Sequence, residues 1–239
     1  SMNDPVLIAC SHGTSSLSGR AAITAIVEGA AALLPGIRVV PAFVDVEYPQ
    51  IDEVVAAETR DSLAIVVPLL LSTGFHTRVD IARAVASADG RAVATRPLGT
   101  HPLIAELVVR RLIEAGATPA DAVVLAAAGS SDPTSAADVA EVALAVSQRW
   151  GGPVEPGFAA MAHPLLPEAL ETARATGART VAASYVLAPG HFASVVRRAG
   201  FEITSEPLGP DPSLAEVVAD RYRAAVCELA VAPETASAT

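Results

Sequence analysis

Hydrophobic and polar residues alternate along this chain in a pattern that recurs eight times. A short apolar run of strand length, such as 64–71, is followed each time by a longer stretch with the spacing of an amphipathic helix. Strands alternating with crossover helices are typical of α/β proteins with parallel sheets. We expect helices between strands near 5–11, 37–46, 63–71, 91–97, 121–128, 153–160, 180–187 and 201–206.

The second half of the sequence repeats the first. RPLGTHPLIAELVVRRL at 96–112 aligns with EPLGPDPSLAEVVADRY at 206–222, and duplication is the simplest explanation. The eight expected strands then divide into two lobes, each with a four-stranded parallel sheet flanked by helices. We expect the lobes at 1–118 and 119–230, with a disordered tail at 231–239.

The two repeats differ in polarity at three aligned positions. Alignment of their glycines and prolines sets His12, Asp45 and His76 opposite Ala128, Ala160 and Phe192. The three polar residues lie at or just beyond the carboxyl ends of expected strands, where open α/β sheets bind ligands. Two imidazoles and a carboxylate form a suitable ligand set for a divalent first-row metal ion with open coordination positions.

A second carboxylate competes with Asp45 for this role. Side chains alternate along a strand with a period of two, so Asp45 and Glu47 are expected on one face of the strand at 37–46. Either carboxylate could reach the crevice, and the sequence leaves the choice open.

Charge and composition exclude several classes of protein. A net charge of −10 disfavours nucleic-acid binding. All sixteen positive residues are arginine, so a Schiff-base lysine and a P-loop lysine are both excluded. The two cysteines have no metal-ligand spacing. No apolar run is long enough to span a membrane and no signal peptide is recognised, so we expect a cytoplasmic protein.

The remaining candidates are weaker. His101 precedes a proline that opens a helix, so we expect it to cap that helix, and His163 is expected in an exposed loop. The Gly/Ser-rich turn SHGTSS could cradle an anion. Arg78 suits either substrate contact or an exposed helix face. The candidate substrate-binding residues are Ser11, Thr14, Gly74, Arg78 and His191.

SHGT after the first strand, PAFVDVEYP, VVPLLLSTGFHTRVDI and RPLGTHPLIAELV occur in this order along the chain. In these motifs the chain resembles the class II chelatases, the family of sirohydrochlorin cobaltochelatases and ferrochelatases, in their two-lobed long form. The resemblance extends from about residue 5 to residue 228. It implies two flavodoxin-like lobes that face each other across a cleft.

The resemblance also implies an activity and a site. The metal-binding and catalytic residues would be His12, His76 and Asp45, where Asp45 replaces the family's usual glutamate. The substrates would be a divalent metal ion (Fe²⁺ or Co²⁺, with Ni²⁺ as a further candidate) and sirohydrochlorin, a tetrapyrrole, with no organic cofactor. Because one chain carries both lobes, a monomer is expected.

Two other functions remain as alternatives. A non-catalytic carrier of metal or tetrapyrrole would use the same histidines without accelerating insertion. A histidine phosphatase is disfavoured, because its nucleophile motif places arginine immediately before the histidine and Ser11 occupies that position here.

Overall fold

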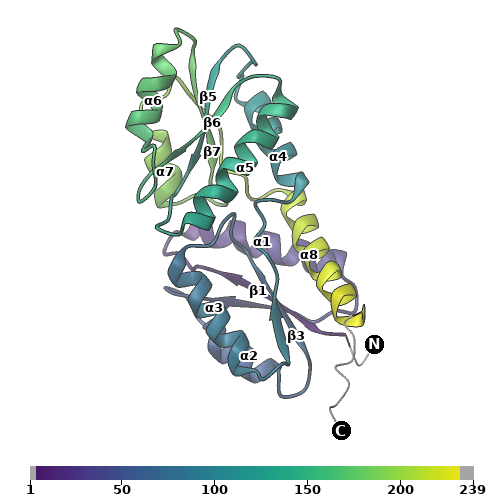
Figure 1. The fold of residues 1–239 in the computed structure, drawn as a ribbon. Helices are drawn as coiled ribbons and strands as arrows, with labels where there is room; N and C mark the ends of the chain where they lie inside the picture. The colour runs from purple at the N-terminus through teal and green to yellow at the C-terminus, as the bar shows by residue number, and fades with distance from the viewer. Residues whose placement is uncertain (1–3, 232–239) are drawn as a thin grey trace.

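The computed structural model describes residues 4–231 as two parallel sheets with helices packed against them (Figure 1). The elements of the N-terminal half are β1 (Val6–Ser11), α1 (Leu17–Leu33), β2 (Val39–Phe43), α2 (Ile51–Glu58), β3 (Ala64–Pro68), α3 (Phe75–Ser87), β4 (Ala92–Ala94) and α4 (Pro102–Glu114). Those of the C-terminal half are β5 (Ala122–Ala127), α5 (Pro133–Trp150), β6 (Val154–Phe158), α6 (Leu166–Ala175), β7 (Thr180–Tyr185), α7 (His191–Arg197), β8 (Ile203–Thr204) and α8 (Pro212–Val231).

The two sheets have the same topology. Their strand orders are β2-β1-β3-β4 and β6-β5-β7-β8, and every pairing is parallel. The central strands β1, β3, β5 and β7 are buried along their whole length, which explains their continuous apolar sequences. The predicted α/β class is therefore confirmed, with two duplicated lobes that each contain a four-stranded parallel sheet flanked by helices.

The edge strands are shorter than predicted. The strand expected at 37–46 ends at Phe43, and those expected at 91–97 and 201–206 shorten to β4 and β8. An edge strand pairs on one side only, so its hydrogen-bonded part stops where the neighbouring strand stops. Of the expected tail at 231–239, Val231 is the last residue of α8, and 232–239 lie outside the described residues.

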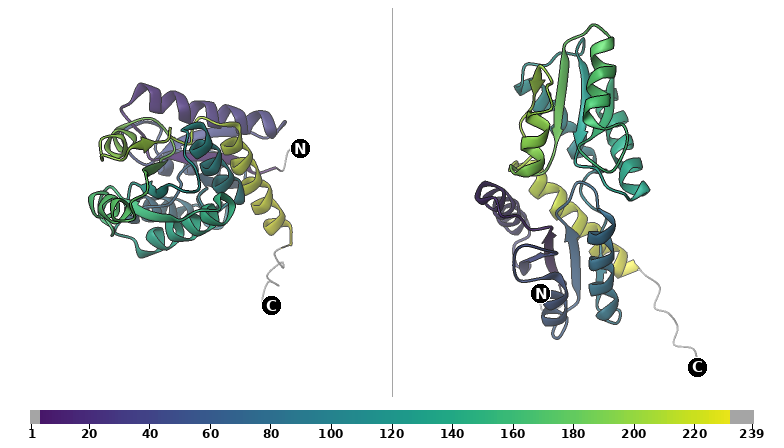
Figure 2. Two further views of the ribbon diagram at one scale, coloured as in Figure 1. Left: turned by 90° about the horizontal axis from the view of Figure 1, so that it is seen from above. Right: turned by 90° about the vertical axis from the view of Figure 1, so that its left-hand side faces the viewer.

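The last helix of each half packs on the other half. α4 packs against β7 and α5, whereas α8 packs against α1 and β3. Figure 2 shows α8, in yellow, running from the C-terminal lobe along the N-terminal lobe. One hydrophobic core therefore includes side chains from both halves, among them Leu7, Leu107, Leu125 and Leu214. The boundary at 118/119 follows the sequence repeat, but α4 and α8 each pack on the half of the chain that lies on the other side of this boundary.

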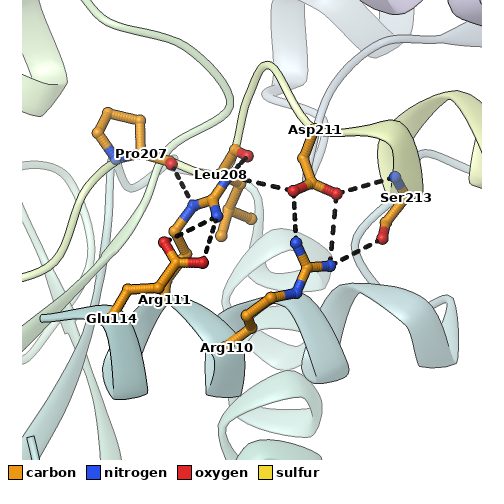
Figure 3. Close-up of polar contacts among 7 residues, drawn as sticks. All are labelled: Arg110, Arg111, Glu114, Pro207, Leu208, Asp211 and Ser213. Atoms are coloured by element: carbon orange, nitrogen blue, oxygen red, sulfur yellow. Dashed lines mark hydrogen bonds and ion pairs between the residues drawn. The ribbon is translucent and has the colours of Figure 1, made fainter.

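Two arginines of α4 hold the start of α8 (Figure 3). Arg110 forms an ion pair with Asp211, whose Oδ1 also accepts a hydrogen bond from the Ser213 N–H at 2.9 Å. Arg111 is largely buried, and its Nε donates to the Pro207 carbonyl oxygen at 2.9 Å. These contacts join α4 to the start of α8. Because each of these two helices packs on the other half of the chain, we call them the exchanged helices.

None of the helices within residues 4–231 combines the length and the apolarity that a membrane span requires.

Candidate functional site

A cavity of about 550 Å³ lies between the two halves, within the range typical of small-molecule sites. Its wall includes the loops that follow β1, β3, β5 and β7 and the first turns of α3 and α7. These loops leave the carboxyl ends of the central strands, which is where the sequence places a ligand. The cavity therefore has one wall from each half of the chain.

His12 reaches the cavity from a turn that requires glycine. Gly13 has φ +98°, and a Cβ there would lie 1.9 Å from the carbonyl oxygen of Asp45. The second repeat has the same construction, because a Cβ on Gly129 (φ +93°) would lie 1.8 Å from the Ala160 carbonyl oxygen. The close crossing of these backbones fixes the position of the residue that follows β1 and of the residue that follows β5. After β1 that residue is His12.

The hydrogen bond of His12 defines its tautomer. Its Nδ1 lies 3.1 Å from the carbonyl oxygen of Gly13. A carbonyl oxygen can only accept, so Nδ1 is the donor and the neutral ring keeps its lone pair on Nε2. The His12 side chain is exposed and lines the cavity, so that lone pair is available to a ligand.

His76 lies in the first turn of α3 and lines the same cavity. The N-cap residue Gly74 has no side chain to cap the helix, and it also lines the cavity. The His76 ring contacts Phe75 edge to face, with 5.5 Å between ring centroids. Both side chains are exposed, so the imidazole is accessible from the cavity.

The two candidate carboxylates lie in different surroundings. Glu47 lines the cavity, and its Oε2 accepts from the Thr14 N–H at 3.1 Å while Oε1 lies 3.4 Å from Arg20 Nε. Asp45 is exposed, is absent from the cavity wall, and accepts from the Val46 N–H at 2.8 Å.

The prediction that these two carboxylates share one strand face is wrong. The chain leaves β2 at Phe43 and makes a tight turn at Val46, where the Glu47 N–H donates to the Asp45 carbonyl oxygen at 2.7 Å. Val46 has φ +66° in this γ-turn, an uncommon conformation for a β-branched residue. The turn ends the strand alternation and separates the two side chains.

The weaker candidates divide between the cavity and its surroundings. Ser11 is buried, Thr14 is partly buried and His191 is exposed in the first turn of α7, and all three line the cavity. Arg78 does not line it. Its Nε donates to Asp132 Oδ2 at 3.0 Å, so it connects α3 to the start of α5 in the other half.

The two remaining histidines lie away from the cavity wall. His101 is the N-cap of α4, and its Nδ1 accepts from the Leu103 N–H at 3.1 Å, which confirms the predicted capping role. His163 is exposed as expected, with Nδ1 3.6 Å from Glu168 Oε1. Neither is among the residues that line the cavity.

The C-terminal wall is largely apolar. The residues opposite the predicted ligands are Ala128, Ala160 and Phe192, of which Ala128 and Phe192 line the cavity. Tyr185 and Phe75 also line it and were not singled out from the sequence. For Tyr185 the sequence repeat contained one signal, because this residue with a hydroxyl group aligns with the apolar Leu69 of the first half. The apolar side chains of this wall would contact the face of a flat ligand.

His12 lies in the turn after β1 and His76 in the first turn of α3, both on one wall, and they are not part of a closed ligand cage. Among residues 4–231, no group of three or more His, Cys, Asp or Glu side chains is arranged to hold a metal ion. Two imidazoles alone leave most coordination positions open. Such an arrangement suits a metal ion that is passed on rather than kept.

Comparison with known proteins decides the family. The CbiX family model matches residues 6–115 and 122–225. The chain belongs to the CbiX family. This membership, together with the two-lobed fold, confirms the resemblance to the class II chelatases. A search of curated protein sequences gives no significant match.

Solved structures show the same fold across nearly the whole chain. SirB from Bacillus subtilis with Fe³⁺ has a TM-score of 0.78 at 21% identity, covering 95% of this chain and 97% of SirB. The sirohydrochlorin chelatase SirB from Bacillus subtilis subspecies spizizenii, in complex with cobalt, has a TM-score of 0.77 at 21% identity, covering 94% and 96%. DR2241 from Deinococcus radiodurans, a multi-domain protein with structural similarity to chelatases, has a TM-score of 0.67 at 21% identity, covering 92% of this CbiX-family chain and 55% of DR2241.

Proposed function

We propose that this CbiX-family protein is a chelatase that inserts a divalent metal ion, Fe²⁺ or Co²⁺, into sirohydrochlorin. The observation that carries the proposal is the asymmetric cavity: one wall presents His12 and His76, and the other presents apolar side chains at the equivalent positions. A flat macrocycle between these walls has one face toward the two imidazoles. Since a single chain builds both walls, we propose that the protein acts as a monomer.

Metal delivery follows from the two histidines. Neutral imidazole binds first-row divalent ions, and the hydrogen bond from Nδ1 of His12 to Gly13 leaves Nε2 to act as a ligand. With two protein ligands and the other positions filled by water, the ion can exchange these ligands for pyrrole nitrogens. His12 and His76 therefore hold the metal substrate over the ring and release it as the four ring nitrogens bind it.

The site carboxylate also requires an assignment. We assign it to Glu47, because its side chain lines the cavity and accepts the Thr14 N–H of the turn that carries His12. In this position it holds that turn in place and offers a proton acceptor on the metal side of the ring. The family resemblance favours Asp45 instead, so the two residues require a direct comparison.

Glu47→Gln and Asp45→Asn provide that comparison. We expect Glu47→Gln to lower kcat for insertion by about 10–100-fold, the range for residues that support metal ligands, because it removes the charge while keeping the shape. Asp45→Asn should change kcat by less than about threefold, because Asp45 lies outside the cavity wall. Anaerobic initial rates measure both. The opposite order of effects would assign the carboxylate to Asp45.

The substrate's carboxylates must be held outside the central part of the cavity. Within the described part of the chain no arginine lines the cavity, whereas the acidic side chain of Glu47 does. Arg20 lies next to it through its contacts with Glu47 and with the Thr14 carbonyl oxygen, and Arg78 lies beside Phe75 at the start of α3. We propose that the macrocycle directs its carboxylates toward these two arginines, whose planar guanidinium groups bind carboxylates well.

Turnover tests the proposed function. The absorbance of sirohydrochlorin is followed under anaerobic conditions with Fe²⁺, Co²⁺ or Ni²⁺, with and without the protein. A chelatase accelerates insertion at substoichiometric concentration, and the relative rates identify the preferred metal. A carrier would change the spectrum by binding at a one-to-one ratio without any acceleration, and that result would overturn the proposal.

A further inference from the structure

The C-terminal wall of the cavity has its own titratable side chains. Among the described residues of this half that line the cavity, these are Tyr185 and His191. Tyr185 is buried, and burial raises the pKa of its phenol far above the usual range, so it stays neutral and is a poor proton acceptor. His191 is exposed and carries an imidazole, a side chain that can act as a general base.

His191 is not a displaced copy of the metal-binding position. After the N-cap Gly74, α3 begins with Phe75-His76. After the N-cap Gly190, α7 begins with His191-Phe192, so histidine and phenylalanine occur in the opposite order. Each pair makes an edge contact, with ring centroids 5.5 Å apart in α3 and 5.2 Å apart in α7. A shift of one residue rotates a helical side chain by about 100°. His191 therefore points in a different direction from a second His76.

Among the described residues, the C-terminal wall offers His191 no second imidazole. The position equivalent to His12 in this half is Ala128. A lone imidazole is a weak metal site, but it is a sufficient proton acceptor. The C-terminal wall thus provides a base without providing a metal site.

Electrostatics favours removing protons on this side. Insertion requires that two pyrrole N–H protons leave while a dication approaches the same four nitrogens. A departing proton on the metal side is repelled by the dication at short range. On the opposite face the ring lies between the proton and the metal.

We propose that His191 accepts a pyrrole proton from the face of the macrocycle opposite to the metal, an inference that rests on the proposed chelatase function. The N–H bond breaks, its electron pair stays on the pyrrole nitrogen and forms the bond to the metal, and the proton binds the imidazole of His191. No oxidation state changes. The second pyrrole proton leaves on the metal side to Glu47, whose negative charge offsets the repulsion by the dication, or to water, and exposed His191 passes its proton to solvent.

His191→Asn tests this proposal, with His163→Asn as the matched control, because His163 is an exposed histidine of the same half outside the cavity wall. We expect His191→Asn to lower kcat by about 100-fold, the lower end for general-base catalysis, with metal and sirohydrochlorin binding within about threefold of the native values. Added imidazole should restore part of the rate. His163→Asn should behave as the native protein.

The pH profile adds a second measurement that a structural role would not change. The other titratable groups facing the cavity are His12, Glu47, His76 and Tyr185, and all remain in the variant. On the acidic limb of log kcat against pH, the slope for His191→Asn should therefore be lower by one than the slope for the native protein.

Three results would overturn the proposal. In the first, native insertion is catalysed and His191→Asn keeps both its kcat and its pH profile, so only the role of His191 fails. In the second, the variant loses sirohydrochlorin binding and imidazole gives no rescue, which would make His191 a binding residue. In the third, the native protein itself gives no acceleration, and the proposed function fails as well.

Discussion

At the scale of single residues, two glycines determine how the chain leaves β1 and β5. Gly13 and Gly129 occupy equivalent turns with positive φ, each against a carbonyl oxygen of the neighbouring loop. A side chain at either position meets backbone, which cannot rotate away. The same turn therefore holds His12 at the cavity in one half and Ala128 in the other.

Gly13→Ala should destabilise the protein by about 3 kcal/mol, because strained φ is combined with a contact of 1.9 Å. Gly36→Ala is the matched control: φ is +81° but no atom lies within 4 Å of its Cβ, so we expect about 1 kcal/mol. Urea unfolding measures both free energies. Equal losses for the two variants would show that the close crossing has no energetic weight.

Gly129→Ala separates stability from function. Its contact of 1.8 Å predicts a loss of stability similar to that of Gly13→Ala, again about 3 kcal/mol. Only Gly13→Ala, however, displaces His12. At a temperature where both variants are folded, insertion should therefore be impaired more strongly in Gly13→Ala.

At the scale of elements, Asp211 joins the two exchanged helices. Its side chain is 8% exposed, and it contacts Arg110 and Arg111 of α4 while accepting from Ser213 in α8. Burial opposes ionisation, but the hydrogen bonds from Arg110 and Ser213 outweigh it and keep the pKa of Asp211 below its usual value. The carboxylate is therefore charged at neutral pH.

Asp211→Asn should lower the free energy of unfolding at neutral pH by about 2 kcal/mol, since it weakens charge-assisted hydrogen bonds. A lowered folded-state pKa stabilises the fold above the unfolded pKa, about 3.9, and this contribution is lost as pH falls through the folded value. The difference between native and variant should therefore shrink below about pH 4. Unfolding curves across pH measure it.

Glu106→Gln is the control for this ion pair. Glu106 pairs with Arg149 at 2.9 Å, but both side chains are about half exposed, so the pair should contribute less than about 1 kcal/mol. A loss for Asp211→Asn that equals this small value, or that is independent of pH, would contradict the role given to Asp211.

The sequence predicts the helices and strands better than it predicts which of them pack together. Strand and helix alternation, the repeat and the cap at His101 are local signals, and the structure confirms them. The exchange of α4 and α8 is not local: both helices have the same amphipathic pattern, and either sheet can bury it. The γ-turn at Val46 was missed for a related reason, because period-two patterning does not show where pairing ends.

At the scale of the whole molecule, the packing of α4 and α8 across the two halves predicts that they unfold as one cooperative unit. Trp150 is the single tryptophan and packs in the core shared by both halves. We expect tryptophan fluorescence and far-UV circular dichroism to give coincident denaturant transitions, as a two-state protein does. Fluorescence and circular dichroism transitions with different midpoints would show that the halves unfold separately.

The cavity also requires both halves of the chain, because each half supplies one wall. His12 and His76 were predicted at strand ends from the repeat alone, and the structure brings both to one cavity wall. The site carboxylate could not be chosen from the sequence, because the choice between Asp45 and Glu47 depends on the turn at Val46. The repeat alignment identified Ala128 and Phe192 opposite the two histidines, but it does not show that Tyr185 and His191 line the same cavity, which depends on how the two halves pack.

The most direct test of the chelatase account is the initial rate of metal insertion into sirohydrochlorin by a His12→Ala/His76→Ala variant. The native protein and His163→Ala, which removes an exposed histidine outside the cavity, serve as references. The account predicts that the double variant falls to the uncatalysed rate while still folding, and that His163→Ala keeps the native rate. A double variant that inserts metal as fast as the native protein would contradict the account.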